Sequence, residues 1–85
     1  MNTKEIKETL VGRIRYTITN TPSQETESMA NIYYYSACEL IHFARDIGFF
    51  TSEQEQYFLS KAVTAYGDAL TNQYEEKSKI DEISD

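Results

Sequence analysis

Apolar side chains recur along this chain with the spacing of a helix, in three stretches that short polar segments separate. The first stretch has an aliphatic residue at every fourth position, at Ile6, Leu10, Ile14 and Ile18. Residues four apart lie on one side of a helix, so this stretch has one buried face. Asn2 can cap the start, and Glu5 can complete a capping box. The pattern predicts a helix over residues 3–18.

The second stretch runs from a proline to a glycine. Thr21 and Pro22 suit the N-cap and the first position of a helix, because proline has no N–H to leave unpaired there. Gly48 can adopt the left-handed conformation that ends many helices. These signals predict a helix over residues 22–47.

The third stretch starts soon after this glycine. Thr51 or Ser52 can cap it, and apolar residues follow on one broad face, which predicts a helix over residues 52–77. The last residues, 79–85, are rich in acidic groups and poor in apolar ones. We expect them to form a flexible acidic tail.

Two short links join these elements, so neighbouring helices must run antiparallel. The sequence predicts an all-α fold, a three-helix up-down-up antiparallel bundle with a short, frayed acidic C-terminal tail. Residues 1–78 form its single helical domain. The first helix is shorter than the other two and leaves part of their apolar surface uncovered. We therefore expect the isolated chain to form a dimer or a higher oligomer.

Residues 31–50, NIYYYSACELIHFARDIGFF, hold three consecutive tyrosines. Neighbouring helix positions are about 100° apart, so the three rings cannot all face inward. We place the centre of the buried face on Met29, Tyr33, Leu40, Ala44 and Ile47. Tyr34 then falls on the flank, and Tyr35 lies opposite the core on the side of Cys38 and His42. These two tyrosines either lie along the bundle with their hydroxyls in water or belong to a surface for a partner.

The charge of the chain limits its partners. Fourteen acidic and eight basic side chains give a net charge of −6, which opposes binding to nucleic acid. The basic residues near the N-terminus, Lys4, Lys7, Arg13 and Arg15, form only a weak patch. A single cysteine, no apolar leader and no apolar run of membrane length predict a cytoplasmic protein without internal disulfides or membrane contact.

Candidate chemistry centres on the second helix. Cys38 and His42 are four residues apart, so a thiol and an imidazole share one face, but no glycine-rich loop accompanies them. Glu39 and His42 have the Glu-x-x-His spacing of di-iron bundles, with Asp68 as the nearest further carboxylate. Both patterns are weak. We expect no catalytic residue, no metal ligand and no cofactor.

The sequence therefore favours a small acidic protein–protein interaction or regulatory module that acts by surface binding, without catalysis. The predicted contact residues are Tyr34, Tyr35, Cys38, Ile41 and His42. The expected partner is another protein, which can be a second copy of the chain. The alternative is an inhibitor whose acidic surface imitates nucleic acid and blocks a DNA- or RNA-binding protein. A metal-binding helical bundle is a third, less favoured hypothesis.

Overall fold

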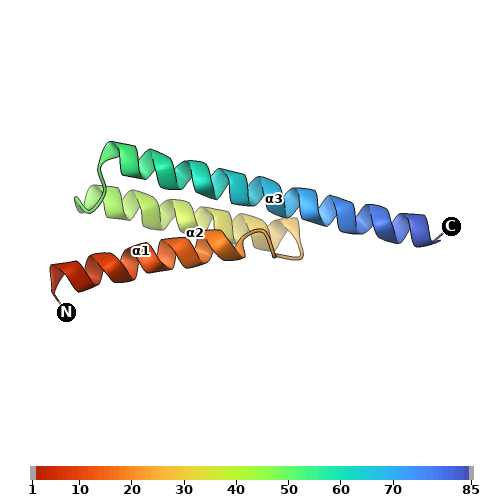
Figure 1. Cartoon of the computed structure of the whole chain (residues 1–85), viewed down its shortest axis with the longest axis horizontal. Coiled ribbons are helices and arrows are strands. Elements are labelled where there is room, and N and C mark those ends of the chain that lie inside the picture. Colours follow the sequence, from red (N-terminus) through yellow and green to blue (C-terminus); the bar gives the residue numbers. More distant parts are fainter. Residues whose placement is uncertain (1, 85) are drawn as a thin grey trace.

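The computed structural model describes the backbone of residues 2–84 and the side chains of residues 2–79. It contains the helices α1 (Thr3–Asn20), α2 (Glu27–Asp46) and α3 (Ser52–Ser84), and no strand occurs within residues 2–84. Two turns reverse the chain, so α1 and α3 run in one direction and α2 runs in the other (Figure 1). The predicted all-α three-helix bundle is confirmed.

The starts of α1 and α3 follow the predicted capping. The side chain of Asn2 accepts a hydrogen bond from the backbone N–H of Glu5 at 2.9 Å. At α3, the Thr51 hydroxyl accepts from the N–H of Gln54 at 3.2 Å, and the Gln54 side chain accepts from the N–H of Thr51 at 2.8 Å. This reciprocal pair satisfies donors that a helix start would otherwise leave unpaired.

The predicted start of α2 at Pro22 is wrong, because the helix begins at Glu27. Thr21 does not cap it: its side chain is buried, and its hydroxyl donates to the carbonyl of Thr17 in the last turn of α1 at 2.7 Å. The cap is Thr26, whose side chain accepts from the N–H of Met29 at 3.1 Å. The segment between Thr21 and Thr26 is therefore a turn that crosses from α1 to α2.

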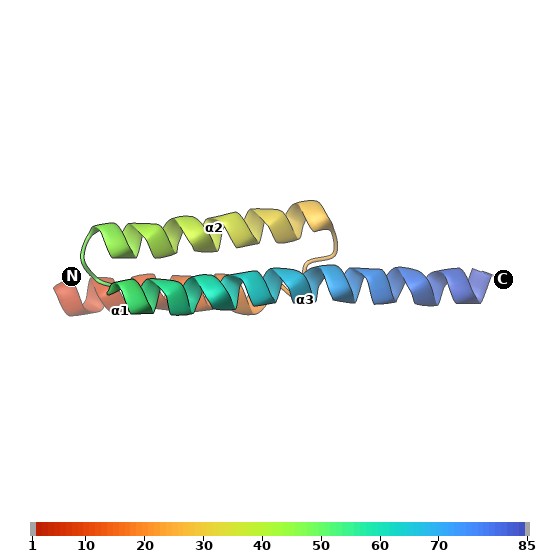
Figure 2. The ribbon, with the colours of Figure 1, turned by 90° about the horizontal axis from the view of Figure 1, so that it is seen from above.

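Helix α3 is much longer than its neighbours. The turn between α1 and α2 meets it at Asn72 and Gln73, whose side-chain amides donate to the carbonyls of Pro22 at 3.1 Å and Gln24 at 3.0 Å. Beyond this point α3 extends alone (Figures 1 and 2).

The predicted end of this helix near residue 77 is also wrong. The backbone stays helical to Ser84, through most of the segment 79–85 that the sequence predicts to be a flexible tail. Residues 75–79 are Glu, Glu, Lys, Ser and Lys, most of which favour a helix even without a packed face. The side chains after Lys79 lie outside the described residues.

The buried core is small and rich in alanine. Its members are Ile14, Ala37, Ile41, Ala44, Phe50, Phe58 and Ala62. Ala65 and Ala69 extend the buried stripe along α3, and Ala30 extends the one along α2. Small side chains at these positions let α2 and α3 approach closely. The rings of Phe50 and Phe58 stack at 5.1 Å and close the end of the core where α2 turns into α3.

The predicted buried face of α2 is wrong by about one residue position. The fully buried positions are Ala30, Ala37, Ile41 and Ala44, whereas Met29 is 46% exposed and Ile47 is 44% exposed. Helix α2 packs against α1 on one side and α3 on the other, so its buried centre points between them. Tyr34 therefore packs against the core, while Tyr33 is half-buried outside that cluster. Leu40 packs at the edge of the core.

Candidate functional site

The five predicted contact residues differ widely in exposure. Tyr35 is 61% exposed and His42 is exposed, but Tyr34 and Cys38 are half-buried. Ile41 is completely buried against the core and has no surface to offer a partner. Its inclusion among the contact residues is wrong because it follows from the misplaced buried face of α2.

Tyr34 links α2 to α3. Its ring lies 5.2 Å from the ring of Tyr66 on α3, and the ring of Tyr35 meets it edge-on at 5.3 Å. Such pairs stabilise a structure beyond the area that they bury. Tyr34 therefore belongs to the interface between α2 and α3. Tyr35 is the outermost of the three rings in the series Tyr66, Tyr34 and Tyr35.

Cys38 lies beside Tyr34 on the same side of α2. Burial raises the pKa of the Cys38 thiol, and its hydrogen bond with Tyr34 only partly opposes that rise. The same hydrogen bond, together with the charge of the Cys38 thiolate once it forms, raises the pKa of Tyr34. The thiol is thus protonated at neutral pH, which makes it a weak nucleophile.

The imidazole of His42 pairs with a side chain of α3. Its Nδ1 lies 3.2 Å from Oε2 of Glu55, so the pair joins α2 to the first turns of α3. The imidazole is mostly exposed, and such a pair contributes little to stability. Among the described residues, no three His, Cys, Asp or Glu side chains are placed to hold one metal ion. Glu39, His42 and Asp68 are therefore not brought together.

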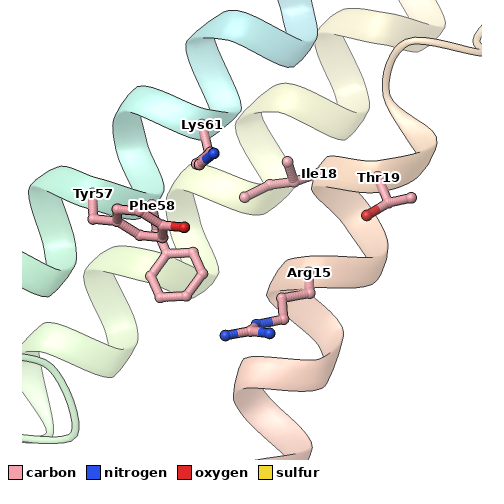
Figure 3. Close-up of a pocket in the computed structure, with 6 residues that line it drawn as sticks. All are labelled: Arg15, Ile18, Thr19, Tyr57, Phe58 and Lys61. Atoms are coloured by element: carbon pink, nitrogen blue, oxygen red, sulfur yellow. The ribbon is translucent and has the colours of Figure 1, made fainter.

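A hollow opens where the bundle is least closed. Helices α1 and α3 contact each other least, and α2 lies on one side of both (Figure 2). On the other side they leave a hollow of about 250 Å³, which we call the α1–α3 groove. Arg15, Ile18 and Thr19 line it from α1, and Tyr57, Phe58 and Lys61 line it from α3 (Figure 3).

The α1–α3 groove combines an aromatic floor with two cations. Phe58 is largely buried and forms the floor, while Tyr57 is exposed and its ring meets that of Phe58 edge-on (Figure 3). The guanidinium carbon of Arg15 lies 5.9 Å from the Phe58 ring centre, and Nζ of Lys61 lies 5.4 Å from that of Tyr57. Both distances suit cation–π contact, which holds the charged groups over the rings.

The basic character continues along α1. A second hollow shares Arg15 with the groove and is lined by Lys4, Lys7, Glu8, Val11 and Gly12 as well. Together the two hollows contain four basic side chains and one carboxylate. In a chain whose net charge is −6, this is a local reversal of sign. It favours acidic groups on whatever approaches this face.

An apolar hollow lies on the opposite side of α1, between α1 and α2. It is lined by Ile6, Thr9, Leu10, Arg13, Leu40 and Phe43, and Phe43 is 53% exposed. We call it the α1–α2 hollow. It has little polar character, so it offers less specificity than the groove.

The groove is not predicted from the sequence. Arg15 is predicted to belong to a weak basic patch, but no role is predicted for Tyr57 or Lys61. Their spacing of four residues places both on one face of α3, which was a usable signal. The remaining step, that this face lies beside Arg15, depends on the packing of α1 relative to α3.

No helix in the described part of the chain has the length and apolar character needed to cross a membrane. Comparison of the chain with protein-family models, curated proteins and solved structures finds no match. The groove therefore has to be interpreted from its own chemistry.

Proposed function

We propose that this chain is a small acidic protein-binding module that accepts a helical segment of a partner in the α1–α3 groove. The observation that supports this proposal is the groove itself. It is an open channel between two helices with an aromatic floor and flanking cations, in a protein that is otherwise acidic. An amphipathic helix can bind in a groove between two helices by placing its apolar face against the groove.

The groove chemistry indicates the partner. Phe58 and Ile18 offer apolar surface to an inserted side chain. Arg15 and Lys61 stand at the sides and can pair with carboxylates, the guanidinium in a bidentate manner. The partner segment is thus an amphipathic helix with an apolar row and acidic flanks. The module acts by occupying that segment, and the proposal assigns it no catalytic step.

A selection experiment tests this proposal. A displayed library of helical peptides with varied charge is selected on the full chain, and affinities of the enriched peptides are measured by calorimetry. We expect acidic amphipathic peptides to be enriched. The double variant Arg15→Glu, Lys61→Glu should bind them at least about tenfold more weakly, because it replaces attraction by repulsion on both sides of the groove.

The matched control is Arg13→Glu, Arg45→Glu, which changes the net charge equally at exposed positions outside the groove. It should bind the peptides within about twofold of the original chain, because distant exposed charges are screened. Equal weakening of both variants would mean that only the overall charge matters. Enrichment of basic peptides, or of none, would contradict the proposal. Salt-sensitive capture of nucleic-acid-binding proteins by the groove variant would instead favour nucleic-acid imitation.

A further inference from the structure

We infer that a second copy of the chain supplies the helical segment, by placing the free end of its α3 in the α1–α3 groove. The free end is residues 74–84, the part of α3 beyond its hydrogen bonds with the α1–α2 turn. This inference rests on the proposed function and names the partner for the same groove.

In the single chain, no other helix lies beside the free end, which runs on past α1 and α2 (Figure 1). Tyr74, its first residue, is 73% exposed, and Glu75 and Glu76 are exposed beside it. Isolated helices of this length are marginal in water, because packing provides most helical stability in proteins. A second copy would provide the missing packing surface.

Charge complementarity favours this occupant. Residues 74–84 contain four acidic and two basic residues, whereas the groove and the hollow next to it contain four basic side chains and one acidic. The segment thus matches the sign that the groove selects. The α1–α2 hollow has no such preference, since Arg13 is its only charged residue.

A two-fold axis allows each copy to place the free end of its α3 in the groove of the other. If the two α3 helices pair antiparallel over their full length, the free end of each lies along the first half of the other, which is the half that lines the groove. Full overlap of Ser52–Ser84 with its copy brings Lys61 opposite Glu75 of the second copy. The contact occurs twice and closes at the dimer, as an isologous interface does. Each groove then receives a fourth helix.

Charge reversal on the full chain tests the pairing. Sedimentation velocity over a micromolar concentration series measures the dimer dissociation constant, and circular dichroism checks the fold. We expect Lys61→Glu and Glu75→Lys each to raise that constant by about tenfold, and the combined variant to restore it, because the swapped charges again attract. The matched control Glu39→Lys lies on α2 outside the groove and should leave it within about twofold.

Three results would overturn the inference. One is a full chain that sediments as the 9.9 kDa species throughout the series. Another is a combined variant that dissociates as much as the single variants. The third is dissociation by Phe43→Asp, which alters the α1–α2 hollow, together with insensitivity to charge reversal. If display peptides still bind the groove in those cases, the proposed function stands and only the identity of the partner is wrong.

Discussion

At the scale of single residues, Leu40 and Ile41 distinguish the buried face of α2 predicted from the sequence from the one observed in the structure. They are adjacent and have the same number of carbon atoms, but Ile41 is completely buried and Leu40 is half-buried at the edge of the core. We expect Ile41→Ala to lower the free energy of unfolding by about 3–5 kcal/mol and Leu40→Ala by about 1–2 kcal/mol. Urea unfolding followed by circular dichroism measures both. A larger loss for Leu40→Ala would support the face predicted from the sequence.

Cys38 and Tyr34 predict a loss of stability in alkali. Both groups have a raised pKa in the folded chain, so they lose their protons more readily in the unfolded chain. High pH therefore favours unfolding. Their contribution is complete below the ordinary thiol pKa of 9.0 and is lost as pH rises through the folded values. We expect the unfolding free energy to fall above about pH 9. The double variant Cys38→Ala, Tyr34→Phe should show a flatter alkaline profile, and an unchanged profile would contradict the prediction.

The same residues show where sequence reasoning stops. The row of tyrosines correctly indicates that one ring faces inward and another outward, and Tyr35 is indeed exposed. The choice between Tyr33 and Tyr34 depends on where the neighbouring helices lie around α2. The large residues Leu40 and Ile47 favour one centre for the buried face of α2. In the structure the centre of that face is rich in alanine, which lets α3 come close. The size of a side chain does not by itself identify the centre of a face.

At the scale of helices, alanine substitutions at Gly48 and Gly12 should change the stability of the chain in opposite directions. Gly48 has a φ of 83°, which a residue with a Cβ rarely adopts, so Gly48→Ala should cost about 1–2 kcal/mol. Gly12 lies inside α1, and a Cβ there would meet nothing within 4 Å. Gly12→Ala should therefore add about 0.4–1 kcal/mol, because alanine loses less backbone freedom on folding. Thermal unfolding of both variants measures the difference. The same sign for both would show that conformational freedom does not dominate at these positions.

The helices themselves follow from local signals, but one boundary does not. Thr21 and Thr26 are both followed by residues that suit a helix start, and only Thr26 caps α2. The first signal is overridden because Thr21 is buried at the end of α1 and the following turn bonds to Asn72 and Gln73. Those partners are 50 and 49 residues, respectively, from the turn residues that they bond. The groove is non-local in the same way, since it joins Arg15 to Lys61.

At the scale of the whole molecule, the chain is elongated. Its Cα radius of gyration is 15.7 Å, and its longest extent is 58 Å against 24 Å and 15 Å across. A compact domain of this length has a radius of gyration of about 12 Å. The difference arises because α3 continues beyond the bundle (Figure 2). The same chain therefore has both an α3 end that extends beyond the bundle and an open α1–α3 groove.

The two amide hydrogen bonds from α3 to the α1–α2 turn also have a consequence for the order of folding. Most other contacts join neighbouring helices, so a chain of this kind folds fast. The bonds of Asn72 and Gln73 join residues 50 and 49 positions apart in sequence, so they can form only after α2 and α3 have come together. We expect Asn72→Ala to raise the unfolding rate about two- to tenfold and to leave the folding rate nearly unchanged. Stopped-flow kinetics in urea measures both rates, and slower folding in this variant would mean that the turn docks before the transition state.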